Sequence, residues 1–347
     1  MKKLVMTGGG TAGHCKPNLA LIPQLSPYFK IDYIGSIGGV EKQLAESYPL
    51  PYYSIPCTKL RRNLSLKNLL IPYVLVKSIF KAKKILKEIS PDVVFSKGGY
   101  VALPVVIAAH SLSIPIIIHE SDLSVGLTNK ICAKYADYVL TSFEKTAKQF
   151  TNGIYTGSPI DEKLFSGNKA AFLKECSFPE NKPVLSVFGG SLGSKTVNAM
   201  IRDSLPALLK KYNVVHICGK NNKVTTKFKG YRQIEFSDNL ADVYAATDIA
   251  VTRGGANTLN ELFALHIPSL VIPLSKKASR GDQIENAIYY ANKGIFPMIG
   301  EEDCNKKALC DGIDELYLKR NRYIDVMKAK EIKNSNKKIV DVIKSVL

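Results

Sequence analysis

The sequence carries four glycine-rich turns, and each directly follows a short apolar run. They are GGGTAG (8–13), KGGY (97–100), GGSLGS (189–194) and RGGA (253–256). Glycine lets backbone N–H groups approach a phosphate closely, and the start of a following helix favours negative charge. The four turns therefore predict sites for an anionic, phosphate-bearing ligand.

Three ionisable side chains suit catalysis or binding, and two of them stand beside these turns. His14 ends the first turn, where a helix dipole favours the neutral imidazole that a general base needs. Asp122, in HESD, follows another apolar run, IPIIIH, rather than a glycine turn, and its role comes from the resemblance given below. Glu261 follows the fourth turn and could accept hydrogen bonds from a ribose diol, although a solvated acid near a helix start remains the plain alternative.

The first turn also satisfies the dinucleotide fingerprint G-x-G-x-x-G. That fingerprint calls for an acidic residue at the end of the second strand, where this chain reads YIGSIGG. We therefore expect no nicotinamide and no other cofactor. We expect no metal either, because no D-x-D is present and the seven scattered cysteines contain no C-x-x-C.

The elements that hold these turns alternate along the whole chain. Short Val- and Ile-rich runs, among them IDYIG, DVVFS, IPIIIH, PVLSVF and DIAVT, are separated by helix-length segments. This alternation predicts an α/β fold with doubly wound parallel sheets. DVVFSKGGY (92–100) is echoed by DIAVTRGGA (248–256), which indicates two tandem Rossmann-like domains. We place them at 1–158 and 159–329, and expect a last helical segment, about 330–347, to pack back on the first domain.

Bulk composition narrows the class of partner. The 347 residues are 46% hydrophobic and 22% charged, which is ordinary for a globular protein, and no apolar run is long enough to span a membrane. The net charge of +18 favours an anionic partner, although a lysine-rich bias explains it equally well. A nucleic-acid-binding protein would interleave aromatic and basic residues, whereas the special residues here are glycines at strand ends, so we expect no nucleic acid.

Together the motifs resemble the MurG-type glycosyltransferases of the two-domain GT-B fold. The matching stretches run in order from residue 8 to residue 287: GGGTAGH, FSKGGYVALPVVIAAHSLSIPIIIHESD, GLTNK, FGGSLGS, TRGGANTLNEL and SRGDQIENA. The resemblance implies two domains facing each other across a cleft. It also implies inverting transfer of N-acetylglucosamine from UDP-N-acetylglucosamine to the 4-hydroxyl of the muramoyl sugar of lipid I, which forms lipid II for peptidoglycan. A diacylglycerol glycosyltransferase of the same fold is the alternative, and a UDP-N-acetylglucosamine epimerase a more distant one.

The resemblance also implies site residues, position by position. His14 and Asp122 are the catalytic candidates. Glu261 would bind the ribose hydroxyls, Ser191 the diphosphate and Ser237 the uracil edge. Gln283, and Asn286 from its place in the loop, would lie near the donor sugar. The remaining substrate contacts would be Thr11, Ala12, Gly13, Asn129, Arg253, Ala256, Asn257, Thr258, Leu259 and Asn260.

Because the acceptor that the resemblance implies carries a lipid tail, the enzyme would have to bind at a membrane surface. The resemblance places the enzyme peripherally at the cytoplasmic face of the plasma membrane, with lipid I, an anionic leaflet and other cell-wall synthesis proteins as partners. The lysine-rich amphipathic segment 66–87 suits such a leaflet, and equally the core face of a domain helix. Three departures from the family pattern, Asp122, Asp161 and Asp282, put the transfer of roles at those positions in doubt.

Overall fold

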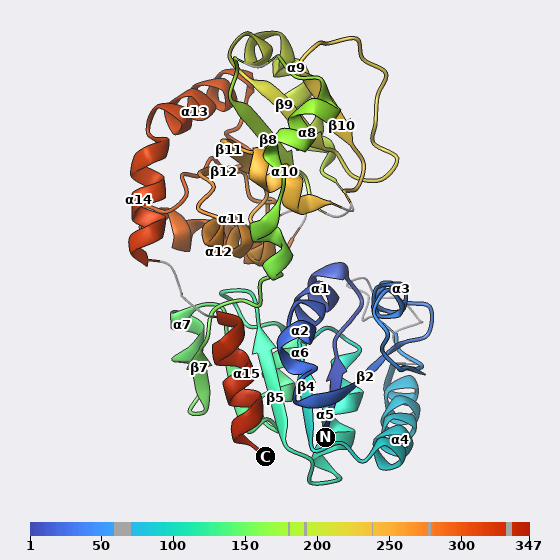
Figure 1. Ribbon diagram of the computed structural model, residues 1–347. Coiled ribbons are helices and arrows are strands. Elements are labelled where there is room, and N and C mark those ends of the chain that lie inside the picture. Colours follow the sequence, from blue (N-terminus) through green and yellow to red (C-terminus); the bar gives the residue numbers. More distant parts are fainter. Residues whose placement is uncertain (59–70, 180, 191–192, 238, 277–278, 331–334) are drawn as a thin grey trace. The chain divides into compact units, whose positions relative to one another are not determined.

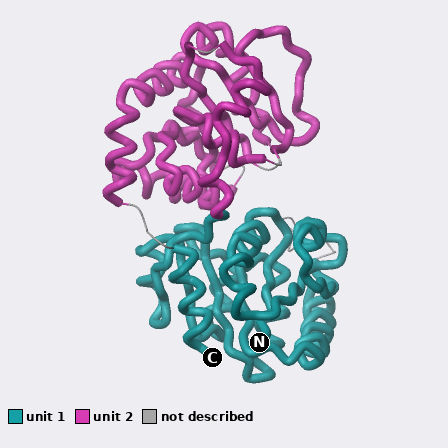
Figure 2. Tube along the Cα trace, in the orientation of Figure 1, with its two compact units in different colours: residues 1–161, 332–347 teal, residues 162–331 magenta. Residues whose placement is uncertain are grey.

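The computed structural model describes residues 1–58, 71–179, 181–190, 193–237, 239–276, 279–330 and 335–347. The chain forms two compact units, shown in two colours in Figure 2. Unit 1 comprises Met1–Asp161 and Ile332–Leu347, and unit 2 comprises Glu162–Glu331. The end of the chain therefore belongs to unit 1, and the chain passes from one unit to the other twice.

Unit 1 is built on a seven-stranded parallel sheet with the order β3-β2-β1-β4-β5-β6-β7 (Figure 1). Its strands are β1 (Lys2–Thr7), β2 (Phe29–Ser36), β3 (Tyr52–Ile55), β4 (Val93–Ser96), β5 (Ile116–Glu120), β6 (Tyr138–Thr141) and β7 (Gly153–Tyr155). Its helices are α1 (Ala12–Ala20), α2 (Ile22–Leu25), α3 (Val40–Glu46), α4 (Ile71–Ile89), α5 (Ala102–His110), α6 (Leu127–Cys132), α7 (Glu144–Ala147) and α15 (Ser335–Ser345).

Helices cover both faces of this sheet because its central strands are apolar on both sides. Along β1, Leu4 and Met6 join a core cluster with α1, α2 and α15, whereas Val5 joins a second cluster with α4 and α5. Side chains that alternate between two buried faces produce the unbroken apolar runs seen in the sequence.

The C-terminal helix α15 is fixed to unit 1 by apolar packing and by one amide. Ile339 and Ile343 are fully buried in the first core cluster. The Asn336 amide accepts a hydrogen bond from the Ile160 N–H (2.9 Å) and donates one to the Ile160 carbonyl (2.7 Å). The start of α15 is thereby tied to the last residues of unit 1 before the chain first leaves it.

Unit 2 repeats the arrangement with a five-stranded parallel sheet of order β10-β9-β8-β11-β12. Its strands are β8 (Val184–Phe188), β9 (Asn213–Ile217), β10 (Tyr231–Ile234), β11 (Ile249–Thr252) and β12 (Ser269–Val271). Its helices are the 3-10 helix η2 (Glu162–Ser166), α8 (Lys169–Cys176), α9 (Lys195–Lys211), α10 (Leu240–Ala246), α11 (Ala256–Ala264), α12 (Asp282–Asn292), α13 (Lys306–Leu318) and α14 (Arg320–Lys330).

The expected fold class is confirmed, since both sheets are parallel and doubly wound. In unit 1, β2 and β3 lie on one side of β1 and β4 to β7 on the other; in unit 2, β9 and β10 lie on one side of β8 and β11 and β12 on the other. All four glycine turns begin at the carboxyl end of a strand, namely β1, β4, β8 and β11. Among the described residues, no helix is both long and apolar enough to cross a membrane.

Candidate active site

The first turn leads from β1 into α1 and places His14 in the first turn of that helix. Thr11 is the N-cap residue, and Ala12 and Gly13 are half-buried at the first two helical positions. The Thr11 Oγ1 atom lies 2.9 Å from His14 Nδ1, and the His14 N–H donates to the Thr11 carbonyl at 3.1 Å. Thr11 therefore fixes both the backbone and the imidazole of His14, and Nε2 is the nitrogen directed away from that contact.

A buried carboxylate that the sequence analysis missed accepts a hydrogen bond from the backbone of this turn. Glu41, on α3, is fully buried. Its Oε2 accepts the Gly10 N–H (3.1 Å), and its Oε1 accepts the Ser36 N–H (2.9 Å) and the Ser36 hydroxyl. The Gly10 N–H, a potential phosphate donor, is thus already used by the protein. Glu41 lies five residues beyond the end of β2, after Gly38, Gly39 and Val40, and no motif in the sequence marks it.

The turn after β4 lies against the first turn. The Gly9 N–H donates to the Gly98 carbonyl at 3.3 Å. Gly99 has φ +82°, and a side chain there would stand 2.2 Å from the Gly9 carbonyl oxygen, so only glycine fits this close approach. The strand ends of β1 and β4 therefore form one continuous edge that carries Thr11 and His14.

Lys97, at the same edge, is a buried lysine to which the sequence analysis gave no role. Its side chain is 2% exposed, and its Nζ lies 2.6 Å from His119 Nδ1 and 2.5 Å from the Ser121 hydroxyl. Burial lowers the pKa of Lys97 to about 7, against the opposing effect of the Glu120 and Asp122 carboxylates. His119 Nε2 lies 2.9 Å from the Gly157 carbonyl, so this nitrogen carries the hydrogen and Nδ1 accepts from Lys97.

Asp122 and Asn129 are both organised by Glu120, the last residue of β5. The Glu120 carboxylate accepts the Asp122 N–H (3.0 Å), the Gly126 N–H (3.0 Å) and the Asn129 side-chain NH₂ (2.9 Å). Asn129 is 5% exposed, and its amide also donates to the His119 carbonyl (3.3 Å). The structure therefore brings Asp122 and Asn129 together at the β5 end, where Asn129 supports the loop that carries Asp122.

In unit 2, Glu261 lies on α11, the helix that follows the RGGA turn. Its Oε2 accepts a hydrogen bond from the Tyr244 hydroxyl at 2.7 Å. Burial, together with the neighbouring Glu261 carboxylate, raises the pKa of Tyr244 well above its ordinary value, so the phenol stays protonated and keeps donating. Tyr244, on α10, therefore fixes the carboxylate that the sequence predicts for the ribose.

For the UDP-sugar that the resemblance implies, Tyr244→Phe is expected to raise the KM by about 3- to 10-fold with kcat nearly unchanged, since it removes one hydrogen bond worth about 0.5–1.5 kcal/mol from the positioning of Glu261. Steady-state kinetics with varied donor measure it. Tyr323→Phe, on α14, is the matched control and should behave as wild type. Equal donor KM values for the two variants would contradict this role of Tyr244.

Two of the predicted nucleotide contacts have their side chains in the core. Leu259 is fully buried, and its N–H already bonds the Gly255 carbonyl at 3.1 Å. Asn260 is 4% exposed, donates to the Ala256 carbonyl (2.6 Å) and accepts from the Tyr290 hydroxyl (2.9 Å). The side chains of these two residues pack in the core, and the substrate contacts that the resemblance implies for them stay predictions. The other predicted residues on this helix, Ala256, Asn257 and Thr258, form its first turn.

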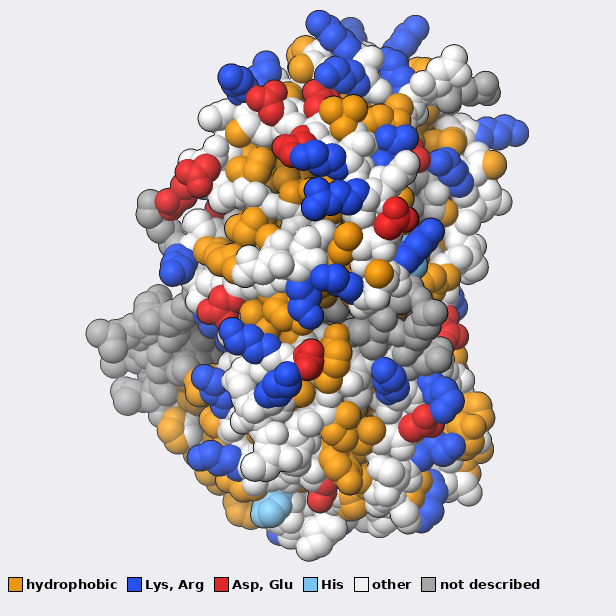
Figure 3. Space-filling view, turned by 90° about the vertical axis from the view of Figure 1, so that its left-hand side faces the viewer, with side chains coloured by type: hydrophobic (Ala, Val, Ile, Leu, Met, Phe, Trp, Pro, Cys, Tyr) orange, Lys and Arg blue, Asp and Glu red, His pale blue; other side chains and the backbone are white. Residues whose placement is uncertain are grey.

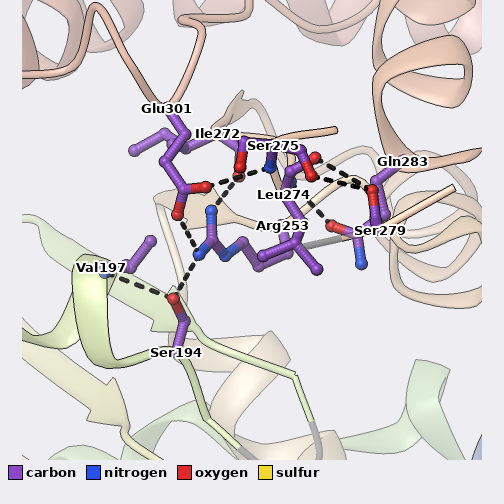
Figure 4. A network of polar contacts seen from close by, with 9 residues as sticks. All are labelled: Ser194, Val197, Arg253, Ile272, Leu274, Ser275, Ser279, Gln283 and Glu301. Carbon is purple, nitrogen blue, oxygen red and sulfur yellow. Dashed lines mark hydrogen bonds and ion pairs between the residues drawn. The ribbon is translucent and has the colours of Figure 1, made fainter. Parts of the chain in front are cut away.

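Arg253 is the centre of a buried polar network in unit 2 (Figure 4). Its Nη2 donates to the Ser194 hydroxyl (2.5 Å) and to Glu301 Oε1 (2.6 Å), and its Nη1 donates to the Ile272 carbonyl (3.1 Å). Ser194 is the N-cap of α9 and also accepts the Val197 N–H at 3.3 Å. The predicted substrate contact Arg253 therefore joins the start of α9 to the loop after β12.

Gln283 lies at the start of α12, beside the same turn. Its Oε1 accepts the Leu274 N–H at 3.1 Å. Gly254 packs against the Gln283 backbone, where a side chain on Gly254 would stand 2.3 Å from the Gln283 carbonyl oxygen, and the buried Asn286 amide donates to the Gly254 carbonyl at 3.0 Å. The RGGA turn, Gln283 and Asn286 thus lie together, although Asn286 uses its amide to hold the turn.

Two further residues, Ser237 and Ser191, are predicted to contact the donor. Ser237 is half-buried in the connection between β10 and α10. Ser191 lies outside the described residues, so its predicted place at the diphosphate stays a prediction. Within the described ranges, no three His, Cys, Asp or Glu side chains gather as a metal site.

Both units match known domain families. The glycosyltransferase family 28 N-terminal domain matches residues 4–141, and the family 28 C-terminal domain matches residues 184–344. Two curated relatives are UDP-N-acetylglucosamine–N-acetylmuramyl-(pentapeptide) pyrophosphoryl-undecaprenol N-acetylglucosamine transferases. The one from Clostridium botulinum is 46% identical and the one from Lachnospira eligens 47% identical, each over 99% of both chains.

A solved structure shows the same fold over the full length. The crystal structure of Acinetobacter baumannii MurG matches with a TM-score of 0.77 at 24% identity, covering 99% of this chain and 100% of that one. The chain and each of the two curated relatives cover 99% of one another, so their lengths agree. The chain therefore belongs to glycosyltransferase family 28, within the family of the MurG-type N-acetylglucosamine transferases.

Proposed function

We propose that the protein transfers N-acetylglucosamine from UDP-N-acetylglucosamine to the 4-hydroxyl of the muramoyl sugar of lipid I, with inversion, and so forms lipid II. The observation that carries this proposal is the 46–47% identity to named transferases of this type over 99% of both chains. The geometry of each unit agrees with it, because unit 2 offers groups suited to a nucleotide sugar and unit 1 offers a candidate base.

In unit 2, the donor would be bound by groups of complementary chemistry. Glu261, held by Tyr244, would accept the ribose hydroxyls, and the starts of α9 and α11 would stabilise the diphosphate as UDP leaves. Ser237 would meet the uracil edge through its backbone. The side-chain oxygen of Gln283, Oε1, already accepts the Leu274 N–H, so the side-chain NH₂ group is the part that would donate to the sugar.

In unit 1, the acceptor would lie along the edge that carries Thr11, His14 and Asp122. Inverting transfer needs one group to take the proton of the attacking hydroxyl. We assign this task to His14, because Thr11 holds its Nδ1 and Nε2 is directed away from that contact. The Asp122 backbone is pinned by Glu120, which suits this residue to orient the acceptor.

Radiolabelled UDP-N-acetylglucosamine tests the proposal with three acceptor conditions, namely a lipid I analogue, diacylglycerol and no acceptor. We expect label only in the product of the lipid I analogue, and a β-linkage in that product by NMR. Label in diacylglycerol would favour the glycolipid alternative. Release of UDP without any acceptor product would contradict both transferases.

We further propose that α4 brings the protein to an anionic membrane surface. Tyr73, Val76 and Phe80 are 68%, 52% and 69% exposed on this helix, and Lys77, Lys81 and Lys84 are exposed beside them. The core-facing residues, such as Ala82, Ile85 and Leu86, occupy the other side. The first residues of the predicted amphipathic segment, 66–70, lie outside the described residues.

Exposed apolar and basic side chains on one helix face suit the boundary of an anionic leaflet. On the face in Figure 3, Lys and Arg side chains are spread over both units rather than gathered in one patch. This distribution is better explained by a lysine-rich composition than by a second docking surface on that face.

Vesicles with and without anionic lipid test the role of α4. We expect the wild-type protein to sediment with anionic vesicles at low salt, and the double variant Val76→Ser, Phe80→Ser to lose most of that binding. Phe165→Ser, which removes a 57% exposed side chain of unit 2, is the matched control. If the double variant sedimented as well as Phe165→Ser, the membrane contact would not lie on α4.

A further inference from the structure

Glu301 is a carboxylate of unit 2 that the sequence motifs do not reach, and it is largely buried. Its side chain is 12% exposed, and the Arg253 side chain that it meets is 8% exposed. Oε1 accepts from Arg253 Nη2 at 2.6 Å, and Oε2 accepts from the Ser275 N–H at 3.0 Å. The Thr196 hydroxyl, in the first turn of α9, adds a smaller contribution that lowers the pKa of this carboxylate.

We propose that Glu301 is a positioning residue of the donor site, which acts through Arg253 to hold the start of α9 and the loop after β12 in the arrangement that binds the UDP-sugar. The inference rests on the proposed function, since it names a further residue of the same site. Figure 4 shows the arrangement, in which the guanidinium lies between Glu301 and Ser194.

The charges of this pair explain why Glu301 is needed. Removing two charged groups from water costs free energy that their attraction only partly returns, so a buried pair is a weak device for stability alone. Burial would raise the pKa of Glu301, but the bonds from Arg253 and Ser275 outweigh burial and hold that pKa below its ordinary value. Glu301 therefore stays ionised and gives the buried guanidinium a counter-charge.

The first consequence concerns the start of α9. Arg253 Nη2 donates to Glu301 and to the Ser194 hydroxyl together, and Ser194 caps α9. Without a carboxylate at position 301, a buried cation would lose its partner, and the guanidinium would be drawn toward water. The helix start proposed for the donor diphosphate would then lose one of its fixed contacts.

The second consequence concerns the loop that leads to Gln283. Glu301 accepts the Ser275 N–H, and the preceding Leu274 N–H donates to the Gln283 side chain. Ser279 holds the loop closed through its bonds to the Leu274 (3.4 Å) and Ser275 (3.1 Å) carbonyls. One carboxylate thus positions the segment that carries the proposed sugar contact as well as the segment proposed for the diphosphate.

Glu301→Gln tests the inference, because glutamine has nearly the same shape without the charge. Glu302→Gln, at the exposed neighbouring position, is the matched control. Calorimetric titration with UDP and donor kinetics are expected to show a Kd and a donor KM raised about tenfold or more in Glu301→Gln, with the acceptor KM within twofold of wild type. Glu302→Gln should match wild type.

A double-mutant cycle separates positioning from simple loss of stability. If Glu301 acts through Arg253, Glu301→Gln in an Arg253→Lys background should raise the UDP Kd by much less than in the wild-type background. An unchanged UDP Kd in folded Glu301→Gln, or full additivity with Arg253→Lys, would overturn the inference. UDP binding needs no acceptor, so a wild-type protein that binds UDP but makes no lipid II would refute the proposed function while this test still stands.

Discussion

His14→Ala is expected to lower kcat by about 10²–10⁴-fold, while the donor KM stays within about twofold of wild type. The reason is the position of the imidazole at the start of α1, where Thr11 Oγ1 lies 2.9 Å from Nδ1. For Nε2 to accept a proton, Nδ1 must carry the hydrogen and donate it to Thr11. Steady-state kinetics at saturating lipid I analogue measure the effect.

Three further variants sharpen this result. Thr11→Val, which removes the partner of Nδ1, should lower kcat by a smaller factor than His14→Ala, because the base remains but its tautomer is no longer fixed. His110→Ala, at an exposed position at the end of α5, is the control for loss of an imidazole. Near wild-type turnover in His14→Ala, together with a collapse of turnover in Asp122→Asn, would move the base to Asp122.

The central strands could be predicted from the sequence because both of their faces are buried. β1, β4, β5, β8 and β11 carry the Val- and Ile-rich runs that the alternation identifies. The strands without such a run are β3 (YYSI), β7 (GIY) and β10 (YRQI), and all three lie at the edge of a sheet. An edge strand pairs on one side only, so it needs no continuous apolar run and leaves little periodic signal.

The residues of the site also fall into those that a sequence motif marks and those that no motif marks. Glycine turns are visible in a sequence because a close approach such as that of Gly99 to Gly9 excludes every side chain. Glu41, Tyr244 and Glu301 act on residues 31, 17 and 48 positions away along the chain. No local spacing marks such partners, which become neighbours only when separate strand ends meet at one edge of a sheet.

Lys97 is expected to make the stability of the folded protein depend on pH. Its pKa of about 7 in the folded protein lies below the ordinary value of 10.5 that it regains on unfolding. Between these values the unfolded chain binds more protons, so this lysine makes the folded state more stable as the pH rises from 7 toward 10. Below pH 7 the lysine is charged in both states, and the full cost of burying the charge is present.

Lys97→Met keeps the length of the side chain but removes the titration. The free energy of unfolding of Lys97→Met, relative to wild type, is therefore expected to fall by about 1.4 kcal/mol for each pH unit between about pH 7.5 and 9.5. Urea unfolding of unit 1 measures this free energy at each pH, with labelling of the buried Cys132 thiol as the readout of unfolding. Lys130→Met, at an exposed position of α6, controls for the loss of one positive charge. A difference between Lys97→Met and wild type that did not change with pH would mean that Lys97 is charged throughout this range. The Glu120 and Asp122 carboxylates would then outweigh burial, and Lys97 would serve the acceptor edge as a permanent cation.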